Sequence, residues 1–136
     1  MSIILGTNRI PYDTLMPDKV VTDFLEFCRN VKSRYEGNAE EIGAREAELG
    51  DLEHYMELHS DLDCKGGYAL YKKMRETRRE RRKCKNEMEL LRPMYDWLEQ
   101  NGDALNRLTI ALGDTRRKAE VIDSRKYMSR TDVLEG

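Results

Sequence analysis

The chain has 136 residues, of which 37% are charged, and its formal net charge is -2 at pH 7. This length allows a single modest hydrophobic core and leaves little room for a second domain. The high charge content and the presence of only three prolines favour long solvated helices over a compact β-sandwich. No apolar run approaches the 18 residues that a membrane-spanning helix needs, so we expect no membrane partner.

Residues 1–16 are predicted to form an N-terminal strand and connector. Residues 2–6 read Ser-Ile-Ile-Leu-Gly, which is compatible with a short β-strand, and a polar stretch that contains one proline follows. The apolar run at the N-terminus is shorter than that of a signal peptide and has no basic flank. We therefore expect the protein to be cytoplasmic.

Residues 17–100 are predicted to form a long antiparallel helical hairpin. Pro17 suits the first position of a helix, where its missing N–H costs nothing, and the helix dipole favours the negative charge of Asp18. Apolar residues then recur in steps of three, four and seven, which is typical of a helix with one apolar side. This first seam consists of Val21, Phe24, Cys28, Val31, Tyr35, Ile42, Leu49, Leu52 and Met56. A bend or break is expected near Gly37, because glycine weakens a helix.

The composition of residues 61–67 predicts the bend of the hairpin, because two aspartates and two glycines lie close together there. A second seam with steps of three and four follows. It consists of Leu70, Met74, Thr77, Arg81, Cys84, Met88, Leu91, Tyr95 and Leu98. Pro93 lies within this pattern, where it removes one backbone hydrogen bond and clashes with the preceding turn. The helix should therefore kink or stop near Arg92.

Residues 101–136 are predicted to form a third helix and a tail, after a break at Asn101 and Gly102. The apolar side of this helix consists of Leu105, Leu108, Leu112, Ala119 and Ile122. The tail after Asp123 is short and polar, and it is compatible with one more strand. The sequence thus predicts one mainly-α domain over residues 1–136. Three helices in an open arrangement bury little surface, so we expect a homodimer or a higher homo-oligomer.

Residues 72–85, the basic run, carry nine basic and two acidic side chains. Such a run is typical of a surface that binds phosphate or nucleic acid. The alternative is pairing within the hairpin, because residues 36–63 carry ten acids and the single basic residue Arg45. We favour this alternative. The sequence pI near 5.8 and the lack of aromatic residues inside the run argue against nucleic acid.

Arg45 and Arg81 both fall on the seams of the predicted hairpin, at about the same level. A buried guanidinium without a counter-charge costs several kcal/mol, so an anion is needed near each of them. The anion is either a carboxylate of the chain, such as Glu41, Glu46 or Glu48, or a phosphate group of a ligand. We favour the internal carboxylate.

The C-terminal segment places Arg125, Lys126, Tyr127 and Arg130 beyond the apolar part of the third helix. These side chains either clamp a phosphate and stack on a base, or belong to a solvated tail. Both interpretations remain open.

The sequence contains no motif of a nucleophilic hydrolase, a zinc protease or a phosphate-binding loop, so we expect no enzymatic activity. Cys28, Cys64 and Cys84 are far apart and show no C-x-x-C spacing, and we interpret them as reduced thiols. His54 and His59 are out of phase for one side of a helix. We therefore expect neither a metal site nor a cofactor.

Three segments carry a resemblance to a known family, namely residues 50–59, 67–74 and 78–91. They read GDLEHYMELH, GYALYKKM and RRERRKCKNEMELL. The chain resembles small proteins carried by phages of Gram-positive bacteria, and among these it is most similar to the Thoeris anti-defence family of signal-sequestering proteins. The resemblance covers roughly residues 40–130.

The resemblance implies a catalytically inert protein that sequesters a cyclic ADP-ribose isomer in the host cytosol and so blocks an anti-phage defence. It also implies assembly into dimers and larger oligomers. Arginines would bind the diphosphate, and Asn106 would contact the base or the ribose. The residues that match by position are Arg45 and Arg75 in the hairpin, Asn106, and the C-terminal pair Arg125 and Arg130. Neither Tyr95 nor Trp97 aligns with the family's base-stacking aromatic residue, which leaves base stacking in doubt.

Two other functions fit the same residues. One is a protein–protein inhibitor or adaptor that presents the acidic side of the hairpin to a host factor. The other is a nucleic-acid-binding regulator that uses the basic run.

Overall fold

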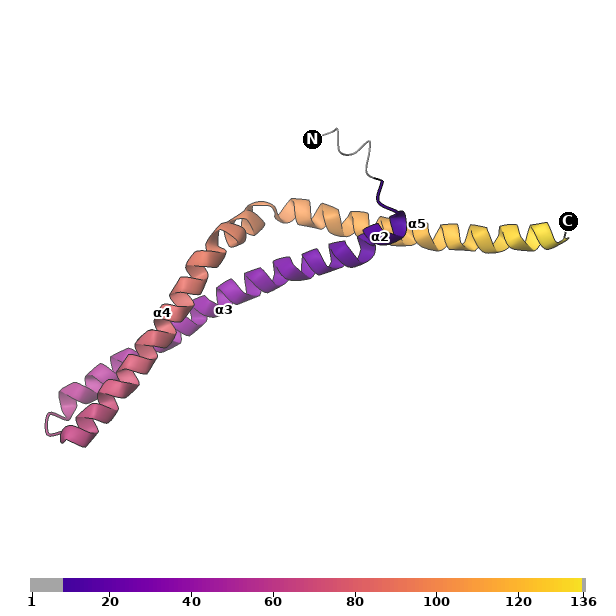
Figure 1. Ribbon diagram of the computed structural model, residues 1–136. Coiled ribbons are helices and arrows are strands. Elements are labelled where there is room, and N and C mark those ends of the chain that lie inside the picture. The colour runs from indigo at the N-terminus through magenta and orange to yellow at the C-terminus, as the bar shows by residue number, and fades with distance from the viewer. Residues whose placement is uncertain (1–8, 136) are drawn as a thin grey trace. The chain divides into compact units, whose positions relative to one another are not determined.

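The computed structural model describes the backbone of residues 9–135 and the side chains of residues 9–125. The described chain contains the helices α2 (Tyr12–Leu15), α3 (Pro17–Leu58), α4 (Cys64–Gln100) and α5 (Gly102–Glu135), and no strand (Figure 1). The predicted mainly-α fold class is therefore confirmed. The N-terminal strand predicted at residues 2–6 lies outside the described residues.

The chain divides into two compact units. The terminal unit consists of Met1–Cys28 and Asn101–Gly136, and the hairpin unit consists of Arg29–Gln100. The backbone of α3 is continuous from one unit into the other.

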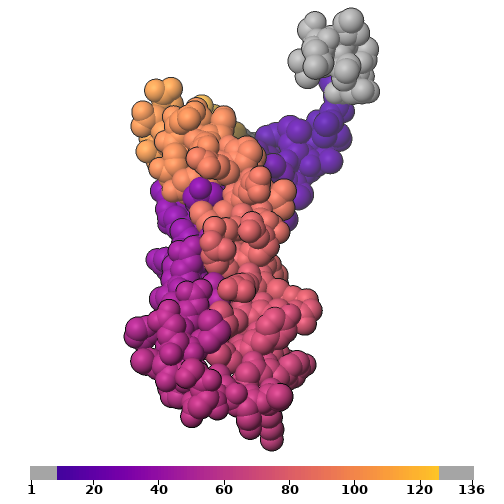
Figure 2. All heavy atoms as spheres, turned by 90° about the vertical axis from the view of Figure 1, so that its left-hand side faces the viewer, coloured from indigo at the N-terminus to yellow at the C-terminus, as the bar shows by residue number. Residues whose placement is uncertain are grey.

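The hairpin unit is built from the long part of α3 and from α4, whose side chains lie against each other along the unit (Figure 2). Its cross-helix contacts show antiparallel pairing, because Arg34 contacts Glu87 whereas Glu48 contacts Thr77. All nine predicted seam residues of α4 are buried or half-buried, which confirms the second seam. In the first seam, the predictions for Phe24 and Met56 are wrong, because these side chains are 40% and 49% exposed.

Two features of the hairpin differ from the sequence prediction, namely the start of α4 and the continuity of α3 at Gly37. α4 begins at Cys64, so Gly66 and Gly67 lie in its first turn and not in the bend. α3 passes through Gly37 without a break, because seam residues on both sides of it pack against α4. α4 also passes through Pro93 and ends at Gln100. The helix therefore does not stop near Arg92, and it changes direction towards its C-terminal end (Figure 1). The short α2, which belongs to the terminal unit, was not expected.

The terminal unit packs the first turns of α3 against α5. Leu25 and Cys28 from α3 and Leu112 from α5 are buried. At the edge of this contact the guanidinium of Arg116 binds both carboxylate oxygens of Asp18, at 2.6 and 2.8 Å. This hydrogen bond lowers the pKa of Asp18.

α5 is longer than predicted, because it continues through the expected tail to Glu135. The prediction of a C-terminal strand is therefore wrong. Residues 124–135 contain neither glycine nor proline, so nothing in them stops a helix that has already begun. The predicted apolar side of α5 is covered only in its first half, because Ala119 and Ile122 are exposed.

Candidate functional site

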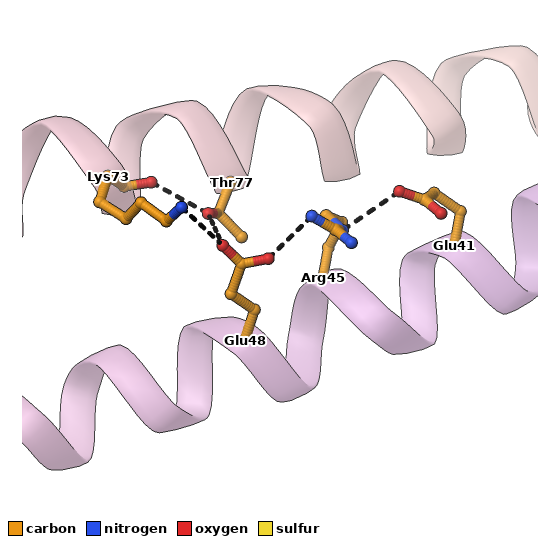
Figure 3. Close-up of polar contacts among 5 residues, drawn as sticks. All are labelled: Glu41, Arg45, Glu48, Lys73 and Thr77. Carbon is orange, nitrogen blue, oxygen red and sulfur yellow. Dashed lines mark hydrogen bonds and ion pairs between the residues drawn. The ribbon is translucent and has the colours of Figure 1, made fainter.

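A polar layer interrupts the hairpin seam at Arg45, whose side chain is 30% exposed (Figure 3). Its Nη1 donates to Oε2 of Glu48 at 2.8 Å, and its buried Nε lies 3.2 Å from Oε1 of Glu41 without hydrogen-bond alignment. The other oxygen of Glu48 accepts a hydrogen bond from Thr77 at 3.0 Å and lies 3.9 Å from Nζ of Lys73. The counter-charges of Arg45 therefore come from the chain itself.

The pocket beside this layer has a volume of about 260 Å³, and its lining contains more acids than bases. It is lined by Arg45, Glu48, Lys73, Glu76, Thr77 and Glu80. A negatively charged ligand would meet three carboxylates there. This side of the hairpin is therefore unsuited to bind a phosphate.

Two further cross-helix contacts hold the hairpin. Arg34 binds Glu87 through both carboxylate oxygens, and Asn38, itself buried, donates to Oε1 of Glu87 at 3.0 Å. These hydrogen bonds, with that from Arg34 the strongest, lower the pKa of Glu87 to about 2. Arg81, the second seam arginine, donates from Nε to Oε1 of Glu46 at 3.0 Å. Both seam arginines thus have the internal carboxylate partners that the sequence analysis favoured.

A second groove of about 470 Å³ has the opposite character, and we name it the basic groove. It is lined by Leu49, Tyr71, Met74, Arg75, Arg78, Arg79, Arg81 and Arg82. Five of these eight residues are arginines and none is acidic. Arg81 is the one of the five that forms an ion pair among the described side chains. The other four leave an uncompensated positive potential in a groove with an apolar floor.

The basic run is therefore only slightly neutralised by the acids of α3. Within the described part of the chain, two of its nine basic side chains form ion pairs, Lys73 with Glu48 and Arg81 with Glu46. These two reach α3 because they lie close to the seam. The expected pairing between the two charged runs is thus realised at two positions, and the arginines at 75, 78, 79 and 82 form no ion pair with α3 among the described side chains.

Tyr71 contributes an aromatic ring to the basic groove and is 60% exposed. It precedes the basic run by one residue, which is why a search for aromatic residues inside the run missed it. Tyr71, Arg75, Arg78 and Arg82 follow one another in steps of four, three and four, so they share one side of α4. The sequence analysis missed Tyr71, Arg78 and Arg82, and this helical spacing is the signal that could have identified them.

The predicted ligand residues of the hairpin unit lie in two different pockets. Arg75 lines the basic groove, whereas Arg45 lines the acidic pocket. Asn106 and Arg125 are both exposed on α5, where a separation of 19 positions corresponds to about 28 Å along the helix. Arg130 lies in the last part of α5, and its side chain is outside the described part.

The two aromatic residues that follow Pro93 differ in exposure, because Tyr95 is half-buried and Trp97 is exposed. Tyr95 stacks on Tyr35 with ring centroids 4.0 Å apart and an angle of 17° between the planes. Its hydroxyl donates to Glu36 at 3.5 Å, so Tyr95 belongs to the hairpin seam. Trp97 is 46% exposed.

The described residues include three cysteines and no cluster of metal-ligating side chains. Cys28 is buried, Cys84 is half-buried and Cys64 is exposed, and all three are free thiols. Burial raises the pKa of Cys28 and of Cys84, which makes their thiolates scarce at neutral pH. In the described part of the chain, no three side chains of His, Cys, Asp or Glu lie together as metal ligands would.

None of the helices in the described part of the chain is both long enough and apolar enough to cross a membrane.

No known family, no curated protein and no solved structure matches this chain.

Proposed function

We propose that this chain is a non-catalytic binding protein whose ligand carries at least two phosphate groups and is held by the basic groove. The observation that supports this most is the set Arg75, Arg78, Arg79 and Arg82, which line one groove and form no ion pair among the described side chains. A guanidinium can donate two parallel hydrogen bonds to one phosphate, and such bonds are about twice as strong as neutral ones. Arginines that lie side by side in one groove can therefore bind two phosphate groups that are adjacent in one ligand.

The ligand that we propose is a cyclic nucleotide of the ADP-ribose type, sequestered in the host cytosol as an anti-defence function of a phage protein. Its identity rests on the family resemblance, and its diphosphate fits the chemistry of the groove. The volume of about 470 Å³ lies in the range of small-molecule sites. Tyr71 and the apolar side chains of Leu49 and Met74 give the groove a surface for a base or a ribose.

The contacts that the resemblance implies for α5 remain part of this proposal. Asn106, Arg125 and Arg130 are exposed or lie beyond the described side chains, so each is open to a separate test. Arg45 is excluded from the proposed site, because Glu41 and Glu48 already occupy its guanidinium.

A thermal-shift screen tests the function. The purified protein is heated with pyrophosphate, ADP-ribose, cyclic ADP-ribose isomers and cyclic dinucleotides in turn. We expect a rise of several degrees with one cyclic ADP-ribose isomer and a smaller rise with pyrophosphate. If no phosphate-bearing compound raises the melting temperature, the proposal is wrong, and a protein–protein inhibitor becomes the better interpretation.

A second candidate, a nucleic-acid-binding regulator, is favoured by one observation. Seven basic side chains of residues 72–85 form no ion pair within the described part, along a helix segment of about 20 Å. The regularly spaced phosphates of a nucleic-acid backbone would match this row of positive charges. Binding to a short duplex that weakens steeply with added salt, in the absence of any cyclic-nucleotide shift, would select this function.

A further inference from the structure

In the terminal unit, the apolar face of α3 is wider than the part of it that is buried. The buried part carries Leu25 and Cys28, which are 8% and 5% exposed. Beside it lie Val20, Phe24 and Phe27, which we name the outer stripe, and these are 56%, 40% and 48% exposed. With about 100° of rotation per residue, the three residues of the outer stripe lie within about 60° of one another, at least about 40° from Cys28 and at least about 100° from Leu25. An apolar face of this width has further surface to bury against another helix.

The outer stripe is large enough to matter for association. Met16, directly before α3, is 46% exposed and lengthens the apolar surface. Four half-exposed side chains of about 200 Å² each offer about 400 Å² of apolar area. A stable interface uses about 800 Å² from each partner, polar rim included. The outer stripe therefore suits the apolar centre of a small, concentration-dependent interface.

The charges beside the outer stripe indicate which partner covers it. Lys19, Asp23 and Glu26 follow one another along one flank of the stripe, and Nζ of Lys19 lies 2.8 Å from Asp23. Glu26 is exposed and forms no ion pair among the described side chains. The flank is therefore positive at its N-terminal end and negative at its C-terminal end.

We infer that a second copy of this chain covers the outer stripe, with the two α3 helices antiparallel about a two-fold axis that crosses α3 at the level of residue 22. In this arrangement Val20 lies opposite Phe24 of the second copy, and the same flank of both helices lies on the same side. Lys19 of each copy then lies beside Glu26 of the other. The surface is thus complementary to itself, as a two-fold interface requires, and the charge order selects the antiparallel direction.

This interface lies in the terminal unit and is independent of the basic groove. Sedimentation velocity over a wide range of protein concentration tests it. We expect the parent protein to change from monomer to dimer as its concentration rises. The double variant Phe24→Ser, Phe27→Ser should dimerise at least about tenfold more weakly. Circular dichroism should show unchanged helix content, because both side chains are substantially exposed in the monomer.

The matched control is Leu90→Ser, which removes an apolar side chain that is 79% exposed in the hairpin unit. This variant should dimerise as the parent does. A parent protein that stays monomeric at every concentration, or a control that weakens dimerisation as much as the double variant, would overturn the inference.

A charge exchange separates a second copy from any other partner. Lys19→Glu and Glu26→Lys should each weaken dimerisation, because each places like charges opposite one another. The combined variant carries both changes in every chain and restores opposite charges across the two-fold axis, so dimerisation should recover. If the combined variant stays as weak as either single variant, the antiparallel pairing is wrong.

Discussion

Arg34 of α3 holds Glu87 of α4 through both carboxylate oxygens, although the two residues are 53 positions apart in the sequence. Asn38 donates to the same carboxylate, so three side chains fix the level at which the two helices meet. This contact and the pair of Glu46 with Arg81 set which α4 residues lie opposite α3. Apart from Arg81, the arginines of the basic groove form no ion pair with the acids of α3 among the described side chains.

The stability of the hairpin should depend on pH through Glu87. Its pKa is lowered from 4.5 to about 2 by the hydrogen bonds from Arg34 and Asn38. A carboxyl group with a lowered pKa in the folded state stabilises the fold fully above its unfolded pKa. That contribution is then lost as the pH falls from about 4.5 to about 2. Urea unfolding of the parent and of Glu87→Gln across this window should show a smaller loss of stability for the variant.

The control for this pH experiment is Glu89→Gln, which changes an exposed acid on the same helix that forms no ion pair among the described side chains. Its stability should follow the parent through the whole acid range. Equal acid sensitivity of the parent and of Glu87→Gln would contradict the assigned role of Glu87.

Leu98 should be one of the residues on which the hairpin depends most. Its side chain is 6% exposed, whereas Leu90 on the same helix is 79% exposed. Leu98→Ala should lower the free energy of unfolding by about 2–4 kcal/mol, because it leaves a cavity in a thin core. Leu90→Ala should change it by less than about 0.5 kcal/mol. Urea denaturation of both variants measures these changes. Similar losses in the free energy of unfolding for the two variants would show that the seam is wrongly placed.

Arg45 should be important for stability and not for ligand binding. Arg45→Met keeps the apolar stem of the side chain, but it removes the counter-charge of Glu41 and leaves Glu48 with Lys73 alone, at 3.9 Å. We expect a loss of about 1–3 kcal/mol in the free energy of unfolding. The dissociation constant for the phosphate-bearing ligand should stay within about twofold of the parent. A stable Arg45→Met variant that no longer binds ligand would restore Arg45 as a ligand residue.

Much of this fold follows from local patterns in the sequence. The start of α3 at Pro17 follows from a capping residue, and the turn residues predicted the bend and the last break to within a few positions, although α4 already begins at Cys64 and α5 at Gly102. The α4 seam follows from spacing alone, which has the period of the helix. The extension of α5 to Glu135 was missed because a polar composition was interpreted as a tail, although no residue in it ends a helix.

The candidate site was harder to predict, because a count of charges ignores direction around a helix. The basic run and the acidic residues of α3 have opposite totals, and this suggested mutual neutralisation. In the hairpin, only basic residues close to the seam reach α3, as Lys73 and Arg81 do. Placing Arg75 and Arg78 on the helix relative to Met74 and Thr77 would have identified them as outward-facing. The pairing of Arg45 with both Glu41 and Glu48 needed side-chain coordinates.

The most direct test of the proposed function is calorimetric titration of the double variant Arg78→Ala, Arg82→Ala with the ligand found by thermal shift. Lys83→Ala with Arg92→Ala is the matched control, because it removes the same charge from α4 outside the basic groove. Each lost arginine contact is worth about 1.5–3 kcal/mol, so the groove variant should bind at least about a hundredfold more weakly. The control should bind as the parent does. Equal affinities of the groove variant and the control would contradict the assignment of the basic groove as the binding site.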